Sequence, residues 1–137
     1  MGRIIVHLHG KPSDKRLSNM IDDYLSRLKS KVKLVTHNVK LSAFEYLEKL
    51  PSDTILLDEI GEEMNSKQFS SLFQNWVIDS NDTNLAIGPA DGFPKEHVRG
   101  AISLSKMTFP HELASVLLIE QLYRANEINR GTSYHRI

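Results

Sequence analysis

The stretch Leu85-Ala86-Ile87-Gly88-Pro89-Ala90-Asp91-Gly92-Phe93 decides the fold prediction for this 137-residue chain. Three apolar residues, typical of a buried strand, run directly into a turn that contains two glycines and a proline. Other short apolar runs lie on both sides of this stretch, and segments with helical spacing separate them. This alternation predicts an α/β fold with a largely parallel sheet.

The other predicted elements extend from this stretch in both directions. The strands are expected at 3–9, 32–39, 54–58, 85–88 and 101–104. Helices are expected from Ser13 or Asp14 to about Lys29, from Ser42 to the stop at Pro51, from Ser66 to about Asn81, and from Pro110 to about Asn129. The pairs Asp58-Glu59 and Glu62-Glu63 are expected on a polar loop, as a solvated acidic edge.

Composition bounds the class of protein. The chain has no cysteine, so disulfides, iron–sulfur clusters and thiol catalysis are excluded. Its first ten residues lack the pattern of a signal peptide, and its longest uninterrupted apolar run is far too short for a membrane span. These observations predict a soluble, cytoplasmic protein with a single domain, 1–137, and no membrane partner.

Charge is balanced overall but unevenly distributed. Residues 1–50 hold ten basic and five acidic residues, whereas residues 51–93 hold one and eight. A neutral total argues against tight, nonspecific RNA binding by a bare monomer. These two charged stretches of sequence form either ordinary solvated surface or a local basic face.

Three segments, 57–61, 88–93 and 104–111, follow predicted strands. Ligands of open α/β sheets bind beyond the carboxyl ends of the strands, so these segments are candidate ligand loops. Gly88 allows the backbone to approach a ligand, or it serves a tight turn. The partly apolar segment 104–109 suits a flat ligand such as adenine, or it joins the core. The helix dipole favours a neutral His111.

The C-terminal part carries two further signals. The last predicted helix has two apolar stripes, and the second requires either another helix of the same chain or a second subunit. The final Tyr134-His135-Arg136 combines groups that stack on bases and pair with phosphate, or it is a docking or disordered tail. His7 and His9 share one face of a strand without a third ligand, so no metal site is predicted.

Several segments, taken together, resemble the RlmH-type large-subunit ribosomal RNA methyltransferases of the SPOUT superfamily. The resemblance rests on Ile55-Leu56-Leu57-Asp58-Glu59-Ile60-Gly61, the turn 87–93, the run 103–111, Glu120-Gln121-Leu122-Tyr123-Arg124-Ala125 and Tyr134-His135-Arg136. It implies an α/β sheet with a C-terminal trefoil knot, and a homodimer that uses S-adenosylmethionine. The implied activity is N3-methylation of a pseudouridine in large-subunit ribosomal RNA of the assembled ribosome.

The resemblance also implies site residues. Cofactor-binding positions carry over to Leu57, Gly88, Leu104, Ser105, Lys106, Met107, Thr108 and Phe109. Our hypothesis is that Tyr134, His135 and Arg136 position the target nucleotide and that His111 orders the loop. Two positions depart from the family pattern: Pro89 replaces a usual glycine, and Ile137 replaces a usual acidic residue. The alternatives are a noncatalytic ribosome- or RNA-binding module and a small protein that binds a nucleotide or a phosphate.

Overall fold

The computed structural model describes residues 2–136, so Ile137 lies outside the described residues. It contains one five-stranded sheet with the order β2-β1-β4-β3-β5, in which all pairings are parallel. The strands are β1 (Ile4–His9), β2 (Val32–His37), β3 (Ile55–Glu63), β4 (Thr83–Ile87) and β5 (Ile102–Ser103). The helices are α1 (Lys15–Leu28), α2 (Ala43–Lys49), α3 (Ser66–Ile78) and α4 (His111–Arg130), with short 3-10 turns at Lys29–Lys31 and Lys95–His97. The predicted α/β fold with a parallel sheet is confirmed.

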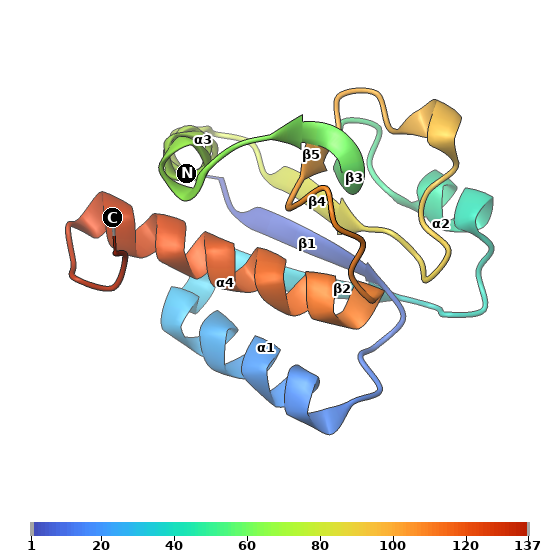
Figure 1. Cartoon of the computed structure of the whole chain (residues 1–137), viewed down its shortest axis with the longest axis horizontal. Coiled ribbons are helices and arrows are strands. Elements are labelled where there is room, and N and C mark those ends of the chain that lie inside the picture. The colour runs from blue at the N-terminus through green and yellow to red at the C-terminus, as the bar shows by residue number, and fades with distance from the viewer. Residues whose placement is uncertain (1, 137) are drawn as a thin grey trace.

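One face of the sheet carries the main core. Helix α4 lies between α1 and α3 and packs against both, as Figure 1 shows. The fully buried side chains of this layer include Val6 of β1, Leu85 of β4, Phe73 of α3 and Leu122 of α4. In the second apolar stripe of α4, Leu118, Leu122 and Ala125 are buried within the same chain, whereas Leu113 of the first stripe is exposed. Of the two explanations for the second stripe, the intramolecular one applies to most of it.

The opposite face has a thinner cover. Short α2 and the segment 93–101 lie over it and form a second cluster around Tyr46, which is completely buried. A capping box fixes the start of α2, because the Ser42 side chain accepts from the Glu45 N–H while the Glu45 side chain accepts from the Ser42 N–H. The capping box sets the start of the helix that places Tyr46 under the centre of the sheet.

The third strand is longer than its sequence predicts. The strand was expected to end at Asp58, but β3 continues to Glu63, so the two acidic pairs lie within a strand and not on a loop. Residues 55–57 pair with β4, and after a register shift Glu62 and Glu63 pair with β5. Gly61 makes this second pairing possible, because a Cβ there would lie 2.6 Å from the backbone of Ala101.

Residues 57–59 of β3 lie beside the turn after β4 and the loop after β5, at the carboxyl edge of the sheet. Helix α4 then begins at this edge and runs to Gly131, whose left-handed conformation (φ 72°) ends it. None of the helices in residues 2–136 is long and apolar enough to cross a membrane. The trefoil knot implied by the resemblance stays a prediction.

Candidate active site

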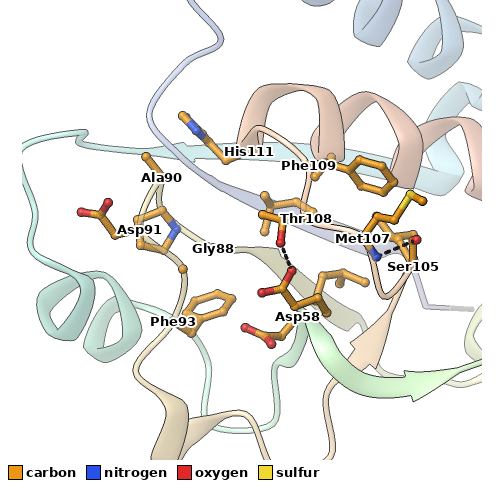
Figure 2. A pocket seen from close by; sticks show the side chains of 17 residues that line it. Asp58, Gly88, Ala90, Asp91, Phe93, Ser105, Met107, Thr108, Phe109 and His111 are labelled. Carbon is orange, nitrogen blue, oxygen red and sulfur yellow. Dashed lines mark hydrogen bonds between the residues drawn. The ribbon is translucent and has the colours of Figure 1, made fainter.

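A cavity lies at the carboxyl edge of the sheet, where part of β3 and two loops from separate parts of the chain meet (Figure 2). Its volume is about 180 Å³. The residues that line it are Leu57, Asp58, Glu59, Ile87, Gly88, Pro89, Ala90, Asp91, Gly92, Phe93, Leu104, Ser105, Met107, Thr108, Phe109, His111 and Ala114. They come from β3, the turn after β4, the loop after β5 and the first turn of α4. This is the place at which open α/β sheets bind ligands.

The lining combines apolar walls with carboxylates. Aliphatic and aromatic side chains such as Leu57, Leu104 and Phe109 form the walls, and Asp58, Glu59 and Asp91 bring three carboxyl groups. Apart from His111, the residues that line the cavity include no basic side chain. Apolar walls suit a flat ring, and the carboxylates favour a cationic over an anionic ligand.

The wall at Gly88 is supported from behind. A Cβ at Gly88 would lie 3.1 Å from the Phe93 ring, so a larger residue would push against that ring. The Phe93 ring stacks on Tyr46, with the ring centroids 5.9 Å apart. The Tyr46 hydroxyl donates to the Ile87 carbonyl oxygen at 2.7 Å, and burial raises the pKa of this phenol. A buried aromatic pair thus holds the glycine turn in place.

Side chains shape the backbone of the loop after β5. The Ser103 hydroxyl donates to the Ser105 carbonyl oxygen at 2.8 Å, and the Ser105 hydroxyl accepts from the Met107 N–H at 3.0 Å. The Thr108 hydroxyl donates to the Glu59 carboxylate on β3. These bonds tie a loop without regular secondary structure to the strand beside it, which gives the cavity a defined wall.

Hydrogen bonds between Glu112 and the segment before α1, called the Glu112 clamp below, hold the rim of the cavity beside His111. The neighbouring Glu112 carboxylate accepts from the Ser13 N–H at 3.0 Å, the Ser13 hydroxyl at 2.8 Å and the Asp14 N–H at 3.1 Å. The backbone hydrogen bonds lower the pKa of Glu112. His111 itself lines the cavity, and Figure 2 shows its ring at the rim near Ala90.

Most predicted cofactor positions lie at this cavity. Leu57, Gly88, Leu104, Ser105, Met107, Thr108 and Phe109 all line it. Lys106 does not: its side chain is 82% exposed, and its amine lies 3.5 Å from a Glu63 carboxylate oxygen. The roles of these residues in cofactor binding stay predictions.

Sequence reasoning missed part of the lining. Asp58 and Glu59 were interpreted as a solvated edge, yet both line the cavity, as do Asp91 and Phe93. The signal was present, because each belongs to a strand end that was already selected. What was missing is the continuation of β3 past Asp58, with its register shift between Leu57 and Glu62.

The C-terminal tail lies at the other end of α4. The helix has 20 residues, which corresponds to a length of about 30 Å, and it starts at the cavity and ends beside the tail. Tyr134 and His135 fold back onto α4, where the Tyr134 hydroxyl donates to Glu120 at 2.9 Å and His135 Nδ1 lies 3.0 Å from Arg124 Nη1. The tail is therefore docked. Its contacts on α4 lie roughly 14 to 20 Å along the helix from His111, and none of residues 134–136 lines the cavity.

The histidines near β1 form hydrogen bonds with each other and with their neighbours. His7 Nδ1 lies 2.9 Å from His37 Nε2, and His7 Nε2 lies 2.9 Å from the Asn84 side-chain oxygen. His9 Nε2 lies 2.7 Å from the Leu41 carbonyl oxygen. Desolvation, with the nearby His7 and His9, lowers the pKa of His37. Within residues 2–136 no group of three or more acidic or histidine side chains could hold a metal ion.

A larger groove, of about 590 Å³, lies elsewhere on the molecule. It is formed by α2, the start of β3 and the segment 97–100, so it lies at the amino edge of the sheet. Parallel sheets do not place their ligand sites there. The smaller cavity at the carboxyl edge is therefore the better candidate for the active site.

A parallel sheet with a cavity at its carboxyl edge is typical of α/β proteins that bind a nucleotide-like ligand. The chain belongs to the SPOUT methyltransferase family, because the model of that family, described as a predicted SPOUT methyltransferase, matches residues 3–135.

Curated relatives agree with this family, and a solved structure agrees with the fold. A protein of Koribacter versatilis (strain Ellin345) named Ribosomal RNA large subunit methyltransferase H is 37% identical, and the match covers 92% of each chain. A protein of Maridesulfovibrio salexigens with the same name is 48% identical over 64% of this chain and 59% of its own length. The crystal structure of TrmJ from Z. mobilis ZM4 has a TM-score of 0.52 at 10% identity and covers 91% of this chain and 70% of that chain, which supports the fold alone.

Proposed function

We propose that the protein transfers a methyl group from S-adenosylmethionine to N3 of a pseudouridine in large-subunit ribosomal RNA, and that it does so as a homodimer. The observation that carries the proposal is the meeting of β3 with the loops after β4 and β5 around one cavity in a chain of the SPOUT methyltransferase family. The curated relatives, which are named as methyltransferases of large-subunit ribosomal RNA, support the choice of substrate.

The cavity has the chemistry that this cofactor requires. The walls formed by Leu57, Leu104 and Phe109 would hold the adenine ring, and backbone groups of the loop 104–109 would read its polar edge. Gly88 leaves the floor of the turn open, and any side chain there would meet Phe93. Bound S-adenosylmethionine would supply an electrophilic methyl group; S-adenosylhomocysteine would be the leaving product, and the proton of N3 would pass to water.

Charge favours a sulfonium over a phosphate. Asp58, Glu59 and Asp91 place three carboxylates around the cavity, and a phosphate would be repelled by them. A nucleotide- or phosphate-binding protein, the third alternative from the sequence, therefore has less support than a methyltransferase. The remaining alternative, an RNA-binding module without catalysis, predicts that the cavity does not bind the cofactor.

Positioning is the main contribution that this chain makes to the reaction. The loops after β4 and β5 are held by Tyr46, Ser105 and Thr108, and a rigid site accelerates methyl transfer by keeping donor and acceptor in line. His111 lies at the rim, in the first turn of α4. It would order the loop and the entering nucleotide.

A homodimer is supported by the position of the tail relative to the cavity. The tail docks on α4 at Glu120 and Arg124, roughly 14 to 20 Å along the helix from His111 at the rim, and none of the residues Tyr134, His135 and Arg136 lines the cavity of its own protomer. The tail of a second protomer would complete the site. Exposed apolar side chains on neighbouring helices, Met20 of α1 and Leu113 of α4, offer a surface for this contact.

Complementation of two inactive variants tests the whole proposal. One variant carries Gly88→Trp in the cavity, and the other carries Arg136→Ala in the tail; each is assayed alone and mixed on ribosomes that lack the methyl group, with mass spectrometry of the rRNA. Each alone should be nearly inactive. Random mixing makes half of the dimers mixed, each with one intact site, so the mixture should recover about a quarter of the wild-type rate.

The outcomes separate the alternatives. A wild-type protein that binds no S-adenosylmethionine in calorimetry would favour the noncatalytic module. Methylation by the wild type without any recovery in the mixture would favour a site contained in one protomer. Equal turnover on free RNA and on ribosomes would contradict the assembled ribosome as the substrate.

A further inference from the structure

The segment Glu120-Gln121-Leu122-Tyr123-Arg124-Ala125 does not line the cavity, and the proposed chemistry does not use it. Its two charged residues meet the tail. Glu120 is a hub: its carboxylate accepts from Arg124 Nε at 3.1 Å, from Arg124 Nη2 at 2.8 Å and from the Tyr134 hydroxyl at 2.9 Å. The side chains of Glu120 and Arg124 are only 15% and 24% exposed, so this pair is better shielded than an ordinary surface ion pair.

Arg124 connects the hub to the next tail residue. Its Nη1 lies 3.0 Å from His135 Nδ1. A guanidinium can only donate, so His135 Nδ1 accepts and the ring keeps its proton on Nε2. The contact thus fixes both the orientation of the imidazole and its tautomer. It leaves the Nε2–H as the donor that His135 can offer.

The Tyr134 ring is enclosed on α4. The Arg124 guanidinium lies 4.9 Å from the ring centroid, and the Tyr123 ring meets it edge-on with centroids 4.7 Å apart. Desolvation and the hydrogen bonds with Tyr24 and Glu120 raise the pKa of Tyr134. A ring held in this way is not available to stack on a base, whereas Arg136 is exposed.

We infer that Glu120 and Arg124 are positioning residues. They anchor Tyr134 and His135 on α4, so that Arg136 is held in a fixed position relative to the RNA. This inference rests on the proposed function, and it divides the tail differently from the sequence-based hypothesis. Tyr134 is an anchor. Arg136, with the Nε2–H of His135 beside it, is the part that contacts the nucleotide.

The experiment compares Glu120→Gln with Asp23→Asn. Asp23 forms an ion pair of the same i,i+4 type with Arg27 on α1, and its carboxylate makes no hydrogen bond to residues 132–136, so it is a matched control for the loss of an ion pair that does not bind the tail directly. We expect Glu120→Gln to lower kcat/KM on ribosomes by roughly tenfold or more, while S-adenosylmethionine affinity and dimer mass stay as in the wild type. The control should keep its kcat/KM.

A double variant separates positioning from general stability. If Glu120 acts through Arg136, adding Glu120→Gln to Arg136→Ala should cause no further loss of kcat/KM. Glu120→Asp should restore part of the lost rate, because it keeps the negative charge. Further loss in the double variant, or full activity of Glu120→Gln, would overturn the inference, and so would full activity of Arg136→Ala.

A second readout does not depend on catalysis. Amide hydrogen exchange at residues 132–136 should become faster in Glu120→Gln and remain unchanged in Asp23→Asn. Slow exchange in both variants would refute the anchor even if the wild type methylates rRNA. Faster exchange in Glu120→Gln alone would support the anchor even if the wild type proved unable to methylate rRNA, so the two proposals fail separately.

Discussion

The Tyr46 hydroxyl donates a 2.7 Å hydrogen bond to the Ile87 carbonyl oxygen, directly before the turn that begins at Gly88. Tyr46 belongs to α2 on the thinly covered face of the sheet, and Ile87 is the last residue of β4. This hydrogen bond therefore joins α2 to the glycine turn that lines the candidate active site. Because Tyr46 is fully buried, solvent does not replace a partner that is lost there.

Tyr46→Phe should therefore lower stability and loosen the cavity. We expect the free energy of unfolding to fall by ~1 kcal/mol, measured by urea denaturation, together with weaker S-adenosylmethionine binding in calorimetry. Thr54→Val is the control, since it removes a hydroxyl–carbonyl bond of equal length on an exposed turn at the other edge of the sheet. An equal effect of the two substitutions on cofactor binding would contradict the connection.

Gly88→Ala should impair the cavity through Phe93. The added Cβ would lie 3.1 Å from that ring, which must move against Tyr46 to make room. We expect affinity for S-adenosylmethionine to fall by about tenfold. The far-UV circular dichroism spectrum, which reports secondary structure, should change little. Adding Phe93→Leu to Gly88→Ala should recover part of the affinity, and no recovery would show that the clash is not the cause.

The carboxylates of the cavity should select the charged form of the cofactor. Asp58→Asn and Asp91→Asn keep the shape of each side chain and remove its charge. We expect several-fold weaker binding of S-adenosylmethionine, which carries a sulfonium, and a smaller change for S-adenosylhomocysteine, which does not. Glu62→Gln, on the same strand but outside the lining, is the control. Equal losses for both ligands would refute the electrostatic role.

Glu112 should make the free energy of unfolding depend on pH in the acidic range. Hydrogen bonds from Ser13 and Asp14 lower the pKa of Glu112 below its ordinary value of 4.5, so the folded protein prefers the carboxylate. Its contribution is then complete above about pH 5 and is lost as pH falls through the folded pKa. The stability difference between wild type and Glu112→Gln, measured by urea denaturation from pH 3 to pH 7, should shrink only at the acidic end.

Glu96→Gln is the control for this series. Glu96 is an exposed carboxylate on the turn Lys95–His97, away from the Glu112 clamp. We expect this substitution to leave the pH profile of unfolding as it is in the wild type. A profile of Glu112→Gln that runs parallel to the wild type over the whole range would show that the Glu112 clamp does not depend on the charge.

The elements of the fold were predictable because their signals are local. The apolar run before Gly88, the cap at Ser42 and the stop at Gly131 each act within a few residues, and each is found where it was expected. The end of β3 was not predictable. It depends on a pairing with β5, 40 residues further along the chain, and on Gly61 fitting against Ala101.

The position of the candidate site in the fold was predictable from the sequence, whereas the orientations of individual side chains were less so. Parallel strands bring their carboxyl ends to one edge, so the convergence of the three segments followed from the pattern. Lys106 faces solvent beside Glu63, although its neighbours on the loop line the cavity. Tyr134 binds Glu120 on α4 of its own chain. Both depend on side-chain directions, which spacing along the sequence does not determine.

Helix α4 begins at the cavity with His111 and ends at Gly131, directly before the docked tail. One additional residue between Glu120 and Gly131 would rotate the tail relative to Glu120 by about 100° and shift it by about 1.5 Å. Such an insertion would turn the tail away from Glu120 while both ends of the helix stayed folded. We therefore expect the length of this part of the helix to be held constant by selection among proteins that share the arrangement.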